Sequence, residues 1–144
     1  MDPVAAVLAD LYDVLTADAT LKTLSGGTVR LFRGEAAENP DGLYFVHDLS
    51  WNSEGGDDWA VCDGPEYKVD IIIDSNVPDS VDAAADRIVR LLEGRTATTP
   101  EGDAHYSLSY FSGGNVPTGT HTEWQRLLVF WILAVAKGQV AAIV

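Results

Sequence analysis

The sequence has a single cysteine, Cys62, and no long apolar run. One cysteine rules out an intrachain disulfide and a cysteine-rich metal site, so we interpret Cys62 as a small, partly buried hydrophobe. The most apolar run, Leu127–Ala136, falls well short of the ~18–20 residues that cross a bilayer. No basic stretch precedes an apolar core at the N-terminus, so we expect no signal peptide and no membrane partner.

Basic residues are also scarce. Nine Lys and Arg face 22 Asp and Glu, which gives a formal net charge of −13, and the stretch from Gly34 to Glu66 contains no Lys or Arg at all. A surface of this kind repels phosphate, which argues against direct nucleic-acid binding. Three interpretations of the acidity remain open: a solvated loop surface, adaptation to a high-salt host, or the wall of a conduit to which DNA does not adhere.

Patterns that carry chemistry are missing too. We find no nucleophile elbow, phosphate-binding loop or dinucleotide fingerprint, and no two of the three histidines have metal-ligand spacing. Asp57, Asp58 and Asp63 could bind a hard cation, but they lack the EF-hand pattern and its closing glutamate. We therefore interpret them as solvated carboxylates. The sequence predicts no catalytic residue, no cofactor and no metal site, and hence a protein that is not an enzyme.

The patterns that are present predict regular secondary structure. Asp2-Pro3 followed by helically spaced Val and Leu predicts a helix from about Pro3 to Thr16. A second amphipathic helix is predicted from Asp79 to Leu92, where acidic residues in the first turn favour the helix dipole. Strands are predicted over Thr28–Arg33, Leu43–Leu49, Tyr67–Asp74, His105–Phe111 and Glu123–Ala136.

This order of elements predicts an α+β fold. We expect a mostly antiparallel sheet of about five strands with two main helices packed on one face, in a single domain over residues 1–144. Two segments stand outside it: an acidic hairpin loop, residues 50–65, and an apolar C-terminal tail, residues 137–144. Long loops inside compact domains are uncommon and often functional. An apolar tail seldom stays free in water, so we expect it to dock.

Four segments in order resemble the tail terminator (tail completion) family of long-tailed phages, over about Leu8–Val135. Their residues are as follows: Leu8, Leu11, Leu15, Ala17-Asp18, Leu21 and Leu24 before Gly26-Gly27; Pro40 with Leu43-Tyr44-Phe45-Val46; Asp63-Gly64-Pro65 before Tyr67–Asp74; and Ala83–Leu92. The acidic hairpin loop and the tail depart from the family pattern.

The resemblance implies a role in assembly. Family members form six-membered rings that stop tail-tube growth and join the tail to the head–neck connector, while DNA passes through the lumen. The implied partners are further copies of the chain in a hexamer, the tail-tube protein and the head–neck connector or stopper protein, with DNA only as passing cargo. The implied location is the tail–neck junction of the virion, after synthesis in the host cytoplasm, and the family has no active site to carry over.

Two surfaces are hypothesised to make these contacts. A closed ring needs two different complementary patches per subunit, with apolar centres. For the subunit interface we propose Trp131, Ile143 and Val144, with an intrachain core position as the alternative for Trp131. For contact with the tube or the lumen we propose a second set in the acidic hairpin loop, with a solvated loop as the alternative. That set is Trp51, Glu54, Asp57, Asp58, Trp59 and Asp63.

Two other functions remain open. A head-completion or stopper protein shares the size and ring symmetry, and co-purification with filled heads rather than tails would identify it. A small metal-dependent enzyme would use the acidic hairpin loop, and stoichiometric metal binding or hydrolytic activity lost on mutation of Asp57, Asp58 or Asp63 would reveal it.

Overall fold

The computed structural model describes residues 3–36, 42–50, 66–74, 79–99, 104–116 and 123–136. Their elements, in chain order, are α1 (Pro3–Ala17), α2 (Ala19–Leu24), β1 (Leu31–Arg33), β2 (Leu43–Ser50), β3 (Glu66–Asp74), α3 (Asp79–Leu92), β4 (Thr96–Thr98), β5 (Ala104–Val116) and β6 (Glu123–Ala136). The predicted α+β fold is confirmed.

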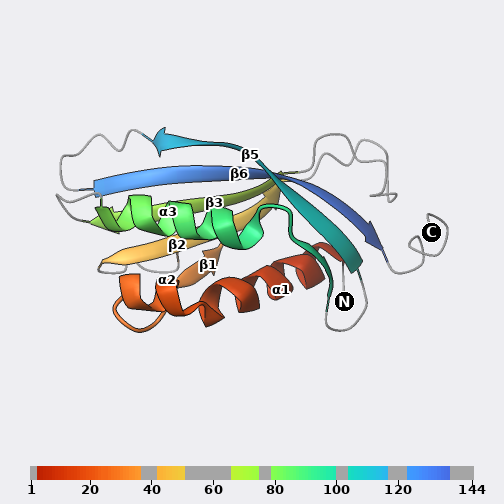
Figure 1. Cartoon of the computed structure of the whole chain (residues 1–144), viewed down its shortest axis with the longest axis horizontal. Helices are drawn as coiled ribbons and strands as arrows, with labels where there is room; N and C mark the ends of the chain where they lie inside the picture. Colours follow the sequence, from red (N-terminus) through yellow and green to blue (C-terminus); the bar gives the residue numbers. More distant parts are fainter. Residues whose placement is uncertain are drawn as a thin grey trace.

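The strands form a six-stranded sheet in the order β1-β2-β3-β6-β5-β4. Each neighbouring pair is antiparallel except β1 and β2, which run parallel with Leu31 opposite Phe45. Long β5 and β6 pair along nearly their whole length (Figure 1), with a register shift between Tyr110 and Ser112. The sheet is therefore mixed, and its two outermost strands are its shortest.

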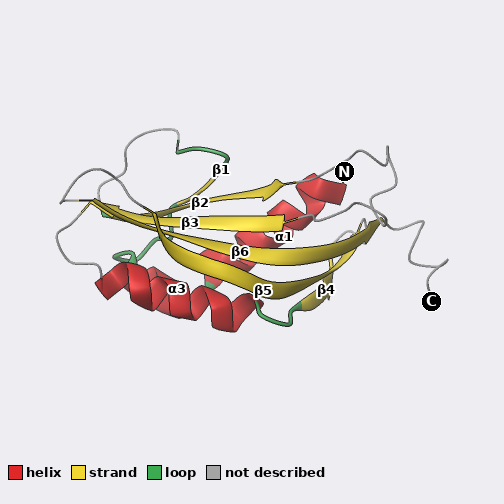
Figure 2. Cartoon of the chain, turned by 90° about the horizontal axis from the view of Figure 1, so that it is seen from above, coloured by secondary structure: helices red, strands yellow, loops and turns green. Residues whose placement is uncertain are grey.

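Alternation along the strands points one face of the sheet toward the helices. Phe45, Ile71, Tyr67 and Phe130 lie on this face and are almost fully buried. Seen from above in Figure 2, the strands pass over α1, while α3 lies beside them. The helices bury Val7, Leu8, Leu11, Leu15, Val81, Ala84, Ala85, Ile88 and Leu92 against the same core. Each large aliphatic side chain buried here contributes about 1.5–3 kcal/mol.

Polar contacts fix the helices to each other and to the sheet. Asp18 caps α2 by accepting a hydrogen bond from the Leu21 amide at 3.0 Å, and it also binds Arg87 of α3 at 2.7 Å. The Arg87 guanidinium holds the pKa of the Asp18 carboxyl below its usual range. On α3, Asp82 accepts a hydrogen bond from Arg126 of β6 at 3.1 Å.

Three sequence predictions need correction. The strand predicted from Thr28 begins at Leu31, and Thr96–Thr98, where no strand was predicted, forms edge strand β4. The strand predicted over His105–Phe111 was placed too short, because β5 continues to Val116. Its Ser and Gly residues remain extended because β6 supplies a pairing partner along this stretch.

Candidate subunit interface

Strand β6 places Trp131 on the face of the sheet that points away from α1 and α3. Its register partners are Glu66 on β3 and Ser109 on β5, and it alternates with Phe130 and Ile132, which are buried in the core. The alternative that Trp131 belongs to the intrachain core is therefore wrong, because 39% of its surface remains exposed.

The structure brings Phe111 together with Trp131. The two rings are tilted by 59° with centroids 4.5 Å apart, and Phe111 is 52% exposed. Phe111 occupies the register shift of β5, where the extra residue is carried beside β6. We refer to Phe111 and Trp131 as the aromatic pair. Sequence reasoning missed Phe111, because a bulge inside a strand has no clear sequence signal.

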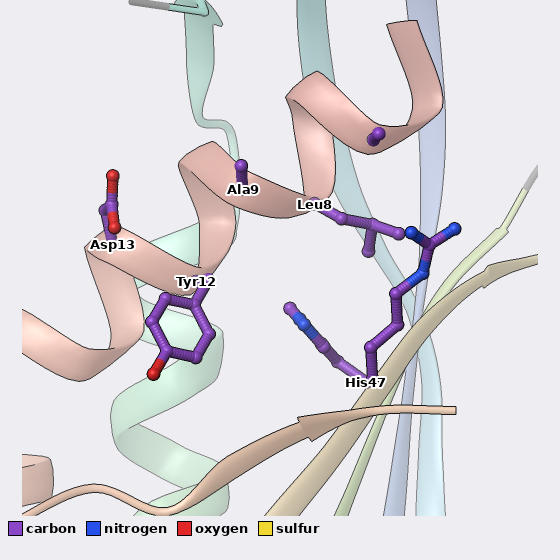
Figure 3. A pocket seen from close by; sticks show the side chains of 7 residues that line it. Leu8, Ala9, Tyr12, Asp13 and His47 are labelled. Atoms are coloured by element: carbon purple, nitrogen blue, oxygen red, sulfur yellow. The ribbon is translucent and has the colours of Figure 1, made fainter. Parts of the chain in front are cut away.

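A second feature is a hollow of about 330 Å³ between α1 and the β1–β2 end of the sheet. Leu8 and Tyr12 project from α1 toward His47 on β2, and Ala9 and Asp13 lie along the same helix (Figure 3). We call this the α1–β2 hollow. It is lined by Ala5, Leu8, Ala9, Tyr12, Asp13, Arg33 and His47.

His47 forms the polar floor of the α1–β2 hollow. Its side chain is 3% exposed, and its Nδ1 shares a 2.6 Å hydrogen bond with the buried hydroxyl of Tyr67. Burial lowers the pKa of His47 to about 4, so the imidazole is neutral at physiological pH. Burial also raises the pKa of Tyr67. The hollow is thus largely apolar, and the imidazole at its floor is uncharged.

A buried polar cluster lies deeper in the core. Tyr106 of β5 donates its hydroxyl hydrogen to Asp10 of α1 and accepts a 3.0 Å hydrogen bond from Arg95, which also binds Asp10 at 3.3 Å. Burial, followed by the bond to Asp10, raises the pKa of Tyr106 well above its ordinary value. These groups satisfy one another's hydrogen-bonding capacity, so the cluster attaches α1 to β5.

The other predicted contact residues lie outside the described residues. These are Ile143 and Val144 in the apolar tail and Trp51, Glu54, Asp57, Asp58, Trp59 and Asp63 in the acidic hairpin loop. Within the described ranges, no three His, Cys, Asp or Glu side chains gather where they could hold a metal ion. No helix among the described residues is both long and apolar enough to cross a membrane.

Comparison with known proteins gives structural matches alone. The sequence matches no protein-family model and no curated protein. The fold matches a chain from the virion of a native gene transfer agent particle, with a TM-score of 0.69, 19% identity, and coverage of 94% of this chain and 98% of that one. A second solved structure, whose name describes no function, matches with a TM-score of 0.64 and 12% identity over 89% of this chain and 92% of its own. At these identities the chains share a fold.

Proposed function

We propose that this chain is a non-enzymatic structural protein of a phage-like virion, and specifically a tail terminator. Its copies close into a hexameric ring that ends tail-tube polymerisation and meets the head–neck connector, and DNA passes through the lumen. The observation that carries the proposal is the end-to-end match in fold to a chain of a gene transfer agent virion. The match covers 94% of this chain and 98% of that one, so it extends over nearly the whole fold of each.

The surface of the described residues supports an assembly role. Soluble monomers rarely expose large apolar patches, and exposed aromatic side chains often anchor protein interfaces. Here the aromatic pair projects from a sheet face that no described helix covers. The net charge of −13 suits a conduit for DNA, because an acidic wall does not retain phosphate.

Electron microscopy of the purified protein tests this function. The protein is imaged in negative stain alone and mixed with tail-tube protein, at low and at high salt. We expect six-fold rings, or tubes capped at one end. Attachment to filled heads in place of tubes would identify a head-completion or stopper protein, and a monomer that forms no ring and binds neither structure would refute the proposal.

A further inference from the structure

A closed ring requires that each subunit carry two unlike patches that fit each other, since a patch that fits itself gives a dimer. The following inference rests on the proposed ring function and identifies those patches. Two features of the described residues have the form that such patches need: the exposed aromatic pair and the α1–β2 hollow.

These two features lie toward opposite ends of the sheet. The aromatic pair comes from β5 and β6, whereas the hollow is bounded by α1 and by residues of β1 and β2. In the strand order β1-β2-β3-β6-β5-β4, strand β3 separates the two groups. One chain therefore cannot place its own aromatic pair in its own hollow, but one copy can reach the next, and repetition of that contact generates a ring or a helix.

Shape and polarity match as well. The aromatic pair is a protruding apolar group, and the hollow presents Ala5, Leu8, Ala9 and the 44% exposed ring of Tyr12. Interface hot spots pair aromatic anchors with apolar pockets in this way. The polar floor of the hollow is a neutral imidazole, so no buried charge is left unpaired when an aromatic side chain covers it.

Charges around both features are complementary. On β3, Glu66 lies opposite Trp131 and Lys68 lies opposite Val129. The ammonium nitrogen of Lys68 is 3.5 Å from a carboxylate oxygen of Glu66. The hollow carries Asp13 and Arg33. Arg33 also lies 3.9 Å from the exposed carboxylate of Asp48, so carboxylates outnumber cations at the hollow, and Lys68 of a docked neighbour can meet this excess negative charge. This pairing favours a second copy of the chain over a partner of uniform charge.

We propose that Phe111 and Trp131 of one subunit dock into the α1–β2 hollow of the next subunit, as the head-to-tail contact of the ring. A single contact of this kind uses both features once per copy and leaves neither exposed.

Mixed cysteine crosslinking tests the contact directly. Ser109 is exposed beside Trp131, and Ala9 is exposed in the hollow. Each is replaced by cysteine in a Cys62→Ser background. Each variant alone, and an equal mixture of the two, is then oxidised under the conditions in which the wild type forms rings or caps tubes. We expect a crosslinked dimer in the mixture and little in either variant alone. A chain with both cysteines should give a ladder of oligomers.

Two pairs of matched variants measure how much each side of the contact contributes to assembly. Trp131→Ala should raise the concentration for half-maximal assembly by about tenfold or more. Trp124→Ala is its control, because Trp124 is 37% exposed on the same strand but on the other face, and it should have little effect. Ala9→Glu should likewise weaken assembly more than Ala83→Glu, which adds the same charge at an exposed position of α3. Circular dichroism checks that each variant folds.

The outcomes separate this contact from the ring function. Wild-type rings with no Ala9–Ser109 crosslink, or rings equally sensitive to Trp124→Ala, would refute the contact and leave the ring standing. Crosslinking of Ser109→Cys to itself would show a two-fold contact between aromatic pairs, and crosslinking to tube protein alone would assign the pair to that partner. Absence of rings and of tube binding by the wild type would refute the proposed function and the contact together.

Discussion

His47 shows how one buried side chain links stability to pH. It was interpreted from sequence as one of three histidines without metal-ligand spacing, and the fold encloses it between β2, α1 and Tyr67. Water is largely excluded from the ring, and this penalises the charged form. Nearby Asp48 opposes that effect and Arg33 adds to it, but burial is the largest cause.

The pKa of His47 is about 4 in the folded protein against 6.5 for an unperturbed histidine, so the unfolded chain binds the proton more tightly. The contribution of neutral His47 to stability is therefore full above about pH 6.5 and is lost as the pH falls toward 4. A difference of this size corresponds to about 3 kcal/mol. Urea unfolding of wild type and His47→Gln, measured from pH 7.5 to 4, should show the wild type losing more stability.

The comparison isolates the histidine because both proteins carry the same carboxylates. His47→Gln retains a polar group near the Tyr67 hydroxyl, so its stability at pH 7.5 is the reference for each curve. If the two curves stayed parallel throughout, His47 would have to titrate normally in the folded protein, and its burial in the α1–β2 hollow would be incorrect.

Sequence patterns predicted the helices and strands well where apolar residues recur with a single helical or strand spacing. Leu8, Leu11 and Leu15 predicted the buried stripe of α1, and alternation in Tyr67–Asp74 predicted the two faces of β3; both are confirmed. Short β4 and the last residues of β5 were not predicted, because their Thr, Ser and Gly content has weak strand preference. What keeps them extended is pairing with a distant neighbour, which no local window of sequence contains.

The same limit applies to the candidate interface. Aromatic and β-branched content predicted β6 and marked Trp131 as a contact residue, but Phe111 and the α1–β2 hollow depend on register and packing between distant segments. The register shift in β5 decides which residue lies beside Trp131. Only a fold that fixes that register brings the two rings together.

The end of β5 contains two adjacent glycines that should respond differently to substitution. A Cβ on Gly113 would lie 3.0 Å from the Leu128 side chain and 3.3 Å from the Leu127 carbonyl oxygen, and would overlap the Tyr110 hydroxyl. A Cβ on Gly114 would meet nothing within 4 Å. We expect Gly113→Ala to lower the free energy of unfolding by about 1–3 kcal/mol through overpacking.

Gly114→Ala is the matched control for this prediction. It is expected to leave stability unchanged or to raise it slightly, because alanine restricts the unfolded chain. Chemical denaturation of both variants beside the wild type gives the comparison. Equal stability of the two variants would mean that Tyr110 and Leu128 move aside freely, and that the register of β5 on β6 is looser than the structure shows.

At the scale of the whole molecule, charge opposes assembly. Each copy carries a formal charge of −13, and a ring brings several copies together. An apolar contact between the aromatic pair and the α1–β2 hollow does not depend on charge, so it competes with a long-range repulsion that salt weakens. The screening length falls from about 10 Å at 0.1 M salt to about 3 Å at 1 M.

We therefore expect assembly to strengthen as sodium chloride rises from about 0.05 M to 1 M. Mass photometry across the series would show a growing fraction of rings, and choline chloride at equal ionic strength should act similarly if screening is the cause. A sulfate salt that acted far more strongly at equal ionic strength would point to enhanced apolar burial instead. Assembly that weakened with salt would contradict the prediction, because attraction between opposite charges, such as Lys68 with Asp13, would then outweigh the repulsion between acidic subunits.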